Sequence, residues 1–445
     1  MALISGKVKL NKLIKELADK IEQSGFWTVT KVPKPLNIRM TNASGTYDDN
    51  GFLHKAKLSR SNAAATDADK ALIEDITSYA YLYYLPNGAI APTFTYDFGI
   101  NRYDNVTENR KVVNMYSLTA RQYSNELPRN TYDTQMPSAW KFEGSNDEVS
   151  WDILDVVDKQ YNFTCREKRF FKFNNTKEYR YYRLTVTEVN GSVAVYPYIG
   201  QFDMYNTLDL VNPDNIGGFF MKSTGTSGKD LLCVFIDGMS LNRISGNYLE
   251  ITIMEDFDAN TLKTRNAMTV PYYTSTNGIY TANNTSVVHL IYNLNINADR
   301  IFFTTELMTA AYAPGNNFAY VGLPIRVANE TDSSAMTISI GFHASTGFPR
   351  LLRNRAGIPL SNYTYKYIPL TYSPSVWGDT VFVSPLFLEG TYEGVRGQMD
   401  GIFTCHGDNI SNRNEIQVGN ETYKIVLVSS AGNANLPYKP LLFKK

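Results

Sequence analysis

Residues 137–155 read PSAWKFEGSNDEVSWDILD, and this stretch decides the predicted fold of the first half of the chain. Trp140 and Phe142 alternate with small or polar residues, which is the two-residue period of a half-buried strand. The GSND run that follows allows the backbone to reverse, because glycine and asparagine tolerate positive φ and Asx side chains bond nearby amides. Alternation resumes at Trp151, so the stretch predicts a β-hairpin with a wide loop at 144–150.

The side chains of this hairpin are predicted to build the fold. The alternation points both Trp140 and Trp151 toward a core, although an exposed tryptophan could instead stack on a sugar ring. Glu143, Asp147 and Glu148 lie at the turn, and we assign them structural roles.

The pattern W-x-F-x-G-S-N-D-x-x-x-W-x-x-L resembles the central hairpin of the discoidin, or coagulation factor 5/8 type C, family of galactose-binding-like domains. Four more segments look like strands of that family and occur in the expected order: 92–99 (PTFTYDFG), 112–121 (VVNMYSLTAR), 179–186 (YRYYRLTV) and 199–205 (IGQFDMY). The resemblance implies a jelly-roll β-sandwich over residues 36–206.

Composition favours an all-β protein and excludes several partners. The chain has 445 residues with 31 Tyr and 23 Phe, and aromatic side chains suit pleated, half-buried surfaces. Its 43 basic residues balance 43 acidic ones, so no polycationic surface for nucleic acid or anionic membranes is indicated. The sequence shows no signal peptide or membrane-spanning run, which predicts a soluble protein made in a cytosol. Cys165, Cys233 and Cys405 are expected to be free thiols.

The N-terminal segment 1–35 is predicted to contain an amphipathic helix. Apolar residues recur at three- and four-residue steps from Val8 to Ile21, and Ser24-Gly25 closes the pattern. A short strand at 26–29 follows. The helix either docks on its own domain or packs on a neighbouring subunit, and the helix with its G-x-W segment resembles the start of some tailed-phage virion proteins.

A second β-rich region of one or two domains is predicted over residues 219–445. The boundary lies in the Asn-, Pro- and Gly-rich run 209–218, and 328–334 is a candidate boundary within the region. The expected strands are 231–236, 248–254, 286–293, 301–305, 335–342, 380–383 and 423–428. The C-terminal run 437–445 either docks on a partner or closes a local strand.

Candidate ligand residues lie in the early loops of the sandwich. In sugar-binding members of the resembled family an aromatic and a polar side chain hold the ligand at one end, which points to Tyr47 and His54. The same family often carries calcium in these loops, and Asp48, Asp49 and Asn50 could supply oxygen ligands. Three adjacent residues are fewer than calcium needs, so a plain Asx turn is the alternative.

A second candidate site is the loop 347–360, where Arg350, Arg353 and Arg355 have no acidic neighbours in sequence. Guanidinium groups bind carboxylates bidentately, so this loop could grip a partner subunit or a sugar acid. A solvated surface loop is the alternative.

No catalytic pattern is recognisable, and the protein is expected not to be an enzyme. The four histidines are far apart in sequence, and neither a phosphate loop nor a nucleophile elbow is present. The leading hypothesis is a structural component of a tailed-phage virion (tail, baseplate or neck), whose partners are other virion proteins, copies of itself and host-surface glycan. The competing hypothesis is a carbohydrate-binding module of a polysaccharide-degrading enzyme.

Overall fold

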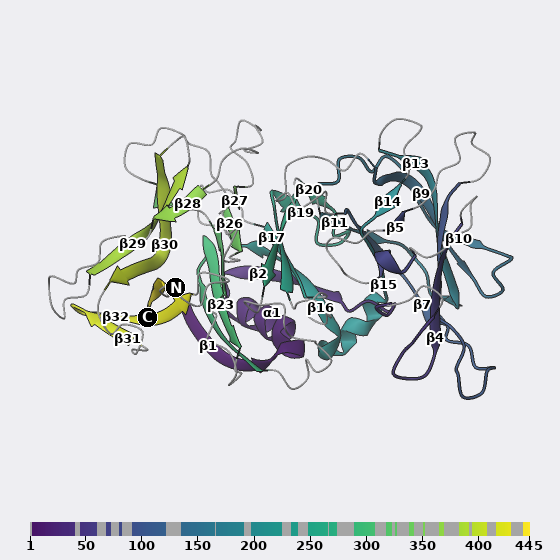
Figure 1. Cartoon of the computed structure of the whole chain (residues 1–445), viewed down its shortest axis with the longest axis horizontal. Helices are drawn as coiled ribbons and strands as arrows, with labels where there is room; N and C mark the ends of the chain where they lie inside the picture. Colours follow the sequence, from purple (N-terminus) through teal and green to yellow (C-terminus); the bar gives the residue numbers. More distant parts are fainter. Residues whose placement is uncertain are drawn as a thin grey trace. The chain divides into compact units, whose positions relative to one another are not determined.

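The computed structural model shows an all-β chain with one α-helix among the residues it describes (Figure 1). These residues are 2–40, 45–59, 68–72, 80–81, 91–121, 135–164, 166–190, 197–224, 233–238, 248–265, 267–273, 289–307, 317–322, 325–326, 338–341, 350–351, 365–368, 382–390, 394–406, 415–428 and 439–445. Within these ranges no helix is long and apolar enough to cross a membrane.

The chain divides into two compact units. The sandwich unit comprises Val32–Gly217 and Phe257–Thr269, and the discontinuous unit comprises Met1–Lys31, Gly218–Asp256 and Val270–Lys445. The N-terminal segment therefore groups with residues that follow the sandwich in sequence. The predicted division at residues 36, 206 and 219 stays a prediction.

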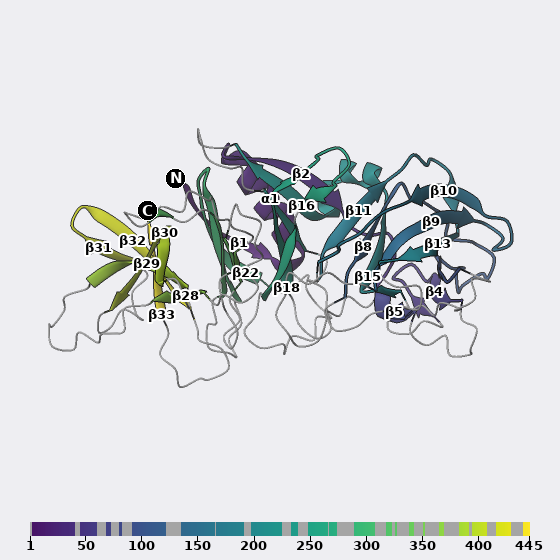
Figure 2. The ribbon, with the colours of Figure 1, turned by 90° about the horizontal axis from the view of Figure 1, so that it is seen from above.

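Two antiparallel sheets form the sandwich (Figure 2). The larger has the order β10 (Asp152–Val157), β9 (Pro137–Ser145), β13 (Tyr181–Val189), β6 (Thr93–Asp97), β4 (Leu53–Leu58) and β3 (Thr46–Tyr47). The smaller has the order β11 (Lys168–Lys172), β8 (Met115–Thr119) and β15 (Gln201–Tyr205). Three short pairs complete the set: β12 (Glu178–Tyr179) with β7 (Lys111–Val112), β14 (Tyr198–Ile199) with β5 (Ala80–Tyr81), and β19 (Asp256–Phe257) with β20 (Thr264–Arg265).

An aromatic core joins the two sheets. Tyr116 of β8 stacks on Phe142 of β9 with ring centroids 4.4 Å apart, and Phe94 of β6 meets Phe202 of β15 at 5.3 Å. Trp140 is completely buried and donates its Nε1–H to the Tyr116 hydroxyl at 2.7 Å. Each buried aromatic stabilises the sandwich by roughly 1.5–3 kcal/mol, so the predicted core role of Trp140 and the predicted hairpin are confirmed.

The predicted core position of Trp151 is wrong. Its ring is half-buried beneath the Arg183 guanidinium, whose Cζ lies 3.9 Å from the ring centroid, and its Nε1–H donates to the Glu148 carbonyl at 3.3 Å. The register explains the error: Ile153 pairs with Glu143 on the outer face, and the register shifts before Asp155. Simple alternation across this bulge assigns the wrong face to the first residues of the strand.

The charged residues of the hairpin have the structural roles predicted for them. Glu143 accepts hydrogen bonds from Arg183 and Thr185. Asp147 accepts backbone N–H bonds from Val149 and Ser150, which close the turn.

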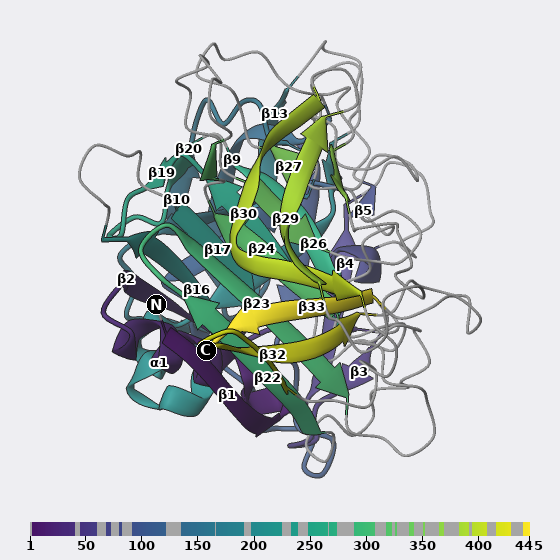
Figure 3. The same ribbon diagram turned by 90° about the vertical axis from the view of Figure 1, so that its left-hand side faces the viewer.

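Three sheets form the discontinuous unit. The first has the order β1 (Ala2–Lys9), β22 (His289–Ile296), β23 (Arg300–Leu307), β24 (Asn317–Gly322), β26 (Ile338–Gly341) and β27 (Arg350–Leu351). The second has the order β2 (Trp27–Pro33), β16 (Ile216–Ser223), β17 (Cys233–Asp237), β18 (Tyr248–Met254) and β21 (Met268–Tyr273). The third has the order β28 (Tyr365–Ile368), β29 (Phe382–Gly390), β30 (Gly394–His406), β33 (Lys439–Lys444), β32 (Glu421–Val428) and β31 (Glu415–Val418), and β25 (Ile325–Arg326) also pairs with β30 (Figure 3).

The predicted N-terminal helix begins later than the apolar period indicates. Helix α1 spans Leu13–Gln23 after a 3-10 turn, whereas residues 2–9 form β1 and pair with β22 along their whole length. Pairing with a strand almost 290 residues away overrides the local period. Five apolar helix residues are buried within the chain, and Glu16 accepts a hydrogen bond from Tyr292 of β22 at 2.5 Å, so α1 docks on its own unit.

One further alternative, at the C-terminus, is decided by strand pairing. Strand β33 pairs with β30 and β32, so the C-terminal run closes a local sheet. Cys233 is buried and is not part of a disulfide, as predicted. The candidate boundary at 328–334 lies outside the described residues.

Candidate functional site

Four loops meet at one end of the larger sheet of the sandwich. Tyr181 at the start of β13 lies opposite both Asp97, the last residue of β6, and Ser145, the last residue of β9. Lys55 of β4 also lies opposite Asp97. Antiparallel pairing therefore brings the loops 48–52, 98–110, 146–151 and 173–180 to the same edge, which we call the loop end.

Two exposed tyrosines and one arginine form a surface at the loop end. Tyr47 is 49% exposed and Tyr103 is 74% exposed, although aromatic rings are usually buried. The Arg102 Cζ lies 5.3 Å from the Tyr47 ring centroid and 4.7 Å from the Tyr103 centroid, both within cation–π distance. Arg102 also donates to the Tyr103 hydroxyl at 2.5 Å. We call these three residues the Tyr–Arg platform.

Gly51 supports the platform from the neighbouring loop. Its φ of +85° is a conformation that glycine adopts without strain, and a Cβ there would lie 2.7 Å from Cε2 of Tyr103. The Gly51 carbonyl accepts the N–H of Arg102 at 2.9 Å. The loop 48–52 therefore packs directly under the platform.

The loop that carries Arg102 and Tyr103 is braced by its own polar side chains. Asp104 accepts the backbone N–H groups of Val106 and Thr107, each at 2.9 Å, and the Thr107 hydroxyl at 2.5 Å. The Thr107 hydroxyl is the main cause that lowers the pKa of Asp104. These bonds hold the loop in shape although its tip is exposed.

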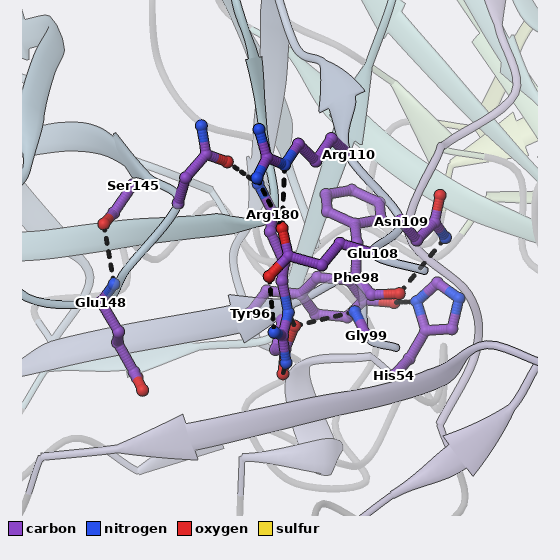
Figure 4. Close-up of polar contacts among 12 residues, drawn as sticks. His54, Tyr96, Phe98, Gly99, Glu108, Asn109, Arg110, Ser145, Glu148 and Arg180 are labelled. Carbon is purple, nitrogen blue, oxygen red and sulfur yellow. Dashed lines mark hydrogen bonds and ion pairs between the residues drawn. The ribbon is translucent and has the colours of Figure 1, made fainter. Parts of the chain in front are cut away.

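Arg180 connects this loop to the sheet (Figure 4). Its guanidinium binds Asp97 through two hydrogen bonds of 2.8 and 2.9 Å, and binds Glu108 at 3.2 Å. Arg110 also binds Glu108, and it is the main cause that lowers the pKa of this carboxyl. The backbone N–H of Arg180 donates to Asn146, so the loops 98–110 and 146–151 meet at one residue.

His54, predicted to bind ligand, lies in the core instead of on the surface (Figure 4). Its side chain is 1% exposed, with Nδ1 2.8 Å from the Tyr96 hydroxyl and Nε2 3.2 Å from Asp48. The Tyr96 hydroxyl accepts the N–H of Ile38, so its own proton is free to be donated to Nδ1. Burial lowers the pKa of His54, which favours the neutral ring. The link between His54 and the loop end is its contact with Asp48.

The three residues predicted to bind calcium form an Asx turn. Oδ1 of Asp48 accepts the N–H groups of Asn50 at 3.0 Å and Phe52 at 2.8 Å, and its other oxygen faces His54. Calcium takes six to eight oxygens, and this turn offers Asp48, Asp49 and Asn50 with Asp48 already engaged. Across the described ranges no three His, Cys, Asp or Glu side chains gather into a metal site. Calcium binding stays a prediction that this geometry does not favour.

The predicted arginine site lies almost entirely outside the described residues. The backbone of Arg350 belongs to β27 and pairs with Ser339 of β26. Arg353 and Arg355 fall in the range 352–364, which is not described. A partner-binding role for the three arginines stays a prediction.

Sequence reasoning named Tyr47 as a candidate but did not name Arg102 or Tyr103. The signal available was the run 101–105 (NRYDN), where an arginine and a tyrosine interrupt a polar loop directly after the YDFG strand. Only the fold shows that this loop and the loop 48–52 lie together.

Comparisons with known proteins give partial structural matches. No protein-family model matches the chain, and no curated protein matches it by sequence. Among solved structures, the chain is similar to the module CpGH89CBM32-5 from Clostridium perfringens, in complex with GalNAc-β-1,3-galactose, at 12% identity and a TM-score of 0.25; the match covers 34% of this chain and 95% of the module. It is similar to the family 32 module of C. perfringens NanJ, in complex with galactose, at 10% identity and a TM-score of 0.25, over 34% and 93% of the two chains. It is also similar to the family 32 carbohydrate-binding module of Streptococcus pneumoniae EndoD, at 10% identity and a TM-score of 0.26, over 38% and 100%.

Proposed function

We propose that the sandwich unit binds glycan through the Tyr–Arg platform, and that the chain is a non-enzymatic structural protein of a tailed-phage virion. In this proposal the protein is assembled in the host cytoplasm into a tail, baseplate or neck together with other virion proteins and copies of itself. The platform then attaches the particle to host-surface glycan.

The observation that carries glycan binding is the exposure of two tyrosine rings around one guanidinium. A tyrosine ring offers an apolar face to the C–H groups of a sugar together with a polar hydroxyl at its edge. Arginine offers five N–H donors to sugar hydroxyls. Because Gly51 and the Asp104 turn hold these side chains from below, the platform is largely formed before a ligand arrives.

The topology of the sandwich supports a structural protein over an appended binding module. Strands β2 and β16 are neighbours in one sheet, and the sandwich residues 34–215 lie between them in sequence. Residues 257–269 also group with the sandwich, so the chain passes between the two units four times. If the sandwich were a module appended through one linker, the chain would pass between the two units only once. A domain inserted into another at several points is typical of a part built into a larger scaffold.

The glycan-binding part of this proposal is tested on the full chain with a glycan array and calorimetry. Tyr47→Ala and Tyr103→Ala are each expected to weaken binding by about tenfold or more, which corresponds to about 1.4 kcal/mol. The matched control is Tyr161→Ala. Tyr161 is 43% exposed in the same unit and follows the far end of β10, and this variant is expected to bind as the parent does. Equal binding by all four proteins would reject the platform.

The virion part is tested with antibody to this chain. Labelling of tail, baseplate or neck on intact particles is expected. Release of reducing ends from host polysaccharide by the purified protein would contradict the non-enzymatic assignment and favour the module of a degrading enzyme.

A further inference from the structure

Among the residues that the structure describes, Arg102 has no carboxylate partner, which distinguishes it from several other arginines of the sandwich unit. Four others in this unit each bind an acidic side chain: Arg110 with Glu108, Arg169 with Glu167, Arg180 with Asp97, and Arg183 with Glu143. Arg102 contacts the Tyr103 hydroxyl and the faces of two tyrosine rings. Across the residues that the structure describes it forms no ion pair.

Two acidic side chains close to Arg102 in the loops are engaged with other groups. Asp104, two residues away, accepts bonds from Val106 and from Thr107 on both of its oxygens. Asp48, across the Gly51 turn, accepts backbone bonds on one oxygen and faces His54 with the other. Asp49 of the same turn is exposed, and among the described residues no carboxylate forms an ion pair with Arg102 beside the two exposed rings.

The chemistry of guanidinium identifies what would complete this arrangement. Its planar fork forms two parallel hydrogen bonds to a carboxylate, and these charge-assisted bonds are about twice as strong as neutral ones. Within the described part of the chain Arg102 donates one hydrogen bond, to the Tyr103 hydroxyl, which leaves N–H donors for an incoming group. The adjoining tyrosine rings provide the apolar contact for the sugar ring that bears such a carboxylate.

We propose that the Tyr–Arg platform selects acidic glycans, with Arg102 binding the carboxylate of a carboxylated sugar and the tyrosines carrying its ring. This inference rests on the proposed glycan binding and names its ligand class. Arg102 is the specificity-determining residue, because the rings alone do not distinguish a carboxylated sugar from its neutral counterpart.

The test compares pairs of ligands that differ only in charge. Oligogalacturonides are titrated into the full chain beside the same oligosaccharides after reduction of their carboxyl groups. Sialyllactose beside its carboxyl-reduced form is a second pair, and it distinguishes a sialic acid from a uronic acid. The acidic member of at least one pair is expected to bind about tenfold or more tightly, and its affinity is expected to fall with added salt.

Variants of Arg102 separate charge from shape. Arg102→Gln is expected to bind both members of the pair with the weak affinity of the neutral one. Arg102→Lys is expected to retain part of the preference, because the charge remains but the fork is lost. Tyr161→Ala, which lies outside the platform, is the control and is expected to retain the full preference.

The outcomes distinguish this inference from the proposed function. Tyrosine-dependent binding that is equal for the acidic and neutral members would overturn the acidic preference and leave glycan binding intact. Absence of binding to both members of both pairs, together with an empty glycan array, would overturn both proposals.

Discussion

Arg180 is expected to stabilise the sandwich and to position the platform, although it does not touch a ligand. Arg180 and Asp97 side chains are each 13% exposed, and Glu108 is 27% exposed. Removing one partner of a fully buried ion pair costs about 3–5 kcal/mol, because the other charge stays buried without a partner. The residual exposure of these groups places Arg180→Met near the lower limit, at about 3 kcal/mol.

This free energy predicts a large thermal shift. For a unit of this size 1 kcal/mol corresponds to roughly 2–4 °C, so unfolding of the sandwich unit is expected to occur roughly 6–12 °C lower in Arg180→Met. Because the chain has two units, the transition is followed by hydrogen exchange of peptides from β6 and β13 during heating. Glycan affinity of the folded variant is measured below the transition and is expected to fall, since the loop 98–110 loses its anchor.

Lys177→Met is the matched control. Lys177 binds Asp152 at 2.6 Å at the same end of the sandwich, but the two side chains are 62% and 55% exposed. An exposed ion pair adds little to stability, because water and salt screen it, so this variant is expected to melt within a few degrees of the parent. The reasoning is refuted if Arg180→Met lowers the transition no more than Lys177→Met does.

Three further predictions concern single side chains of the sandwich. Gly51→Ala places an L side chain at positive φ, which costs about 1–2 kcal/mol of stability, and its Cβ displaces the Tyr103 ring. Calorimetry is expected to show that glycan affinity falls by about tenfold. Unchanged affinity would contradict the role of Gly51. Burial raises the pKa of Asp155 above its usual value of 3.8, so the folded protein loses stability as the pH rises from 3.8 through the raised pKa. Asp155→Asn removes this ionisation and is expected to raise the melting temperature at pH 7. A lower melting temperature would refute this prediction. Backbone N–H bonds from Ser150 and Val149 lower the pKa of Asp147 to about 2. The contribution of this carboxylate to stability is therefore complete above pH 3.8 and is lost as the pH falls toward 2. An NMR titration of the Asp147 carboxyl measures its pKa, and a value near 3.8 would contradict this prediction.

Several strand positions in the sandwich were predictable. The hairpin segment 137–155 followed from alternation and turn chemistry, and it contains β9 and most of β10. The segments 92–99, 112–121, 179–186 and 199–205 were predicted from the resemblance to the discoidin family, and they contain β6, β8, most of β13 and β15. In the second half, the segment predicted at 248–254 matches β18 at both ends.

The errors occur where distant residues override a local pattern. The apolar period beginning at Val8 indicates a helix, yet eight backbone pairs with β22 make residues 2–9 a strand. The alternation through Trp151 indicates a core position, yet the register shift in β10 places the ring under Arg183. In both cases pairing with another strand decides the outcome, and its partner cannot be recognised from the segment alone.

The sequence by itself determined that this chain is built from antiparallel strands, that PSAWKFEGSNDEVSWDILD forms a hairpin, and that Trp140 belongs in a core. The tertiary structure alone decided the candidate site. Tyr47 and Tyr103 are more than fifty residues apart, and the register of β4, β6, β9 and β13 brings their loops to one edge of a sheet. Because side-chain proximity follows from strand pairing rather than from residue type, the position of Arg102 between two exposed tyrosine rings becomes visible only in the folded chain.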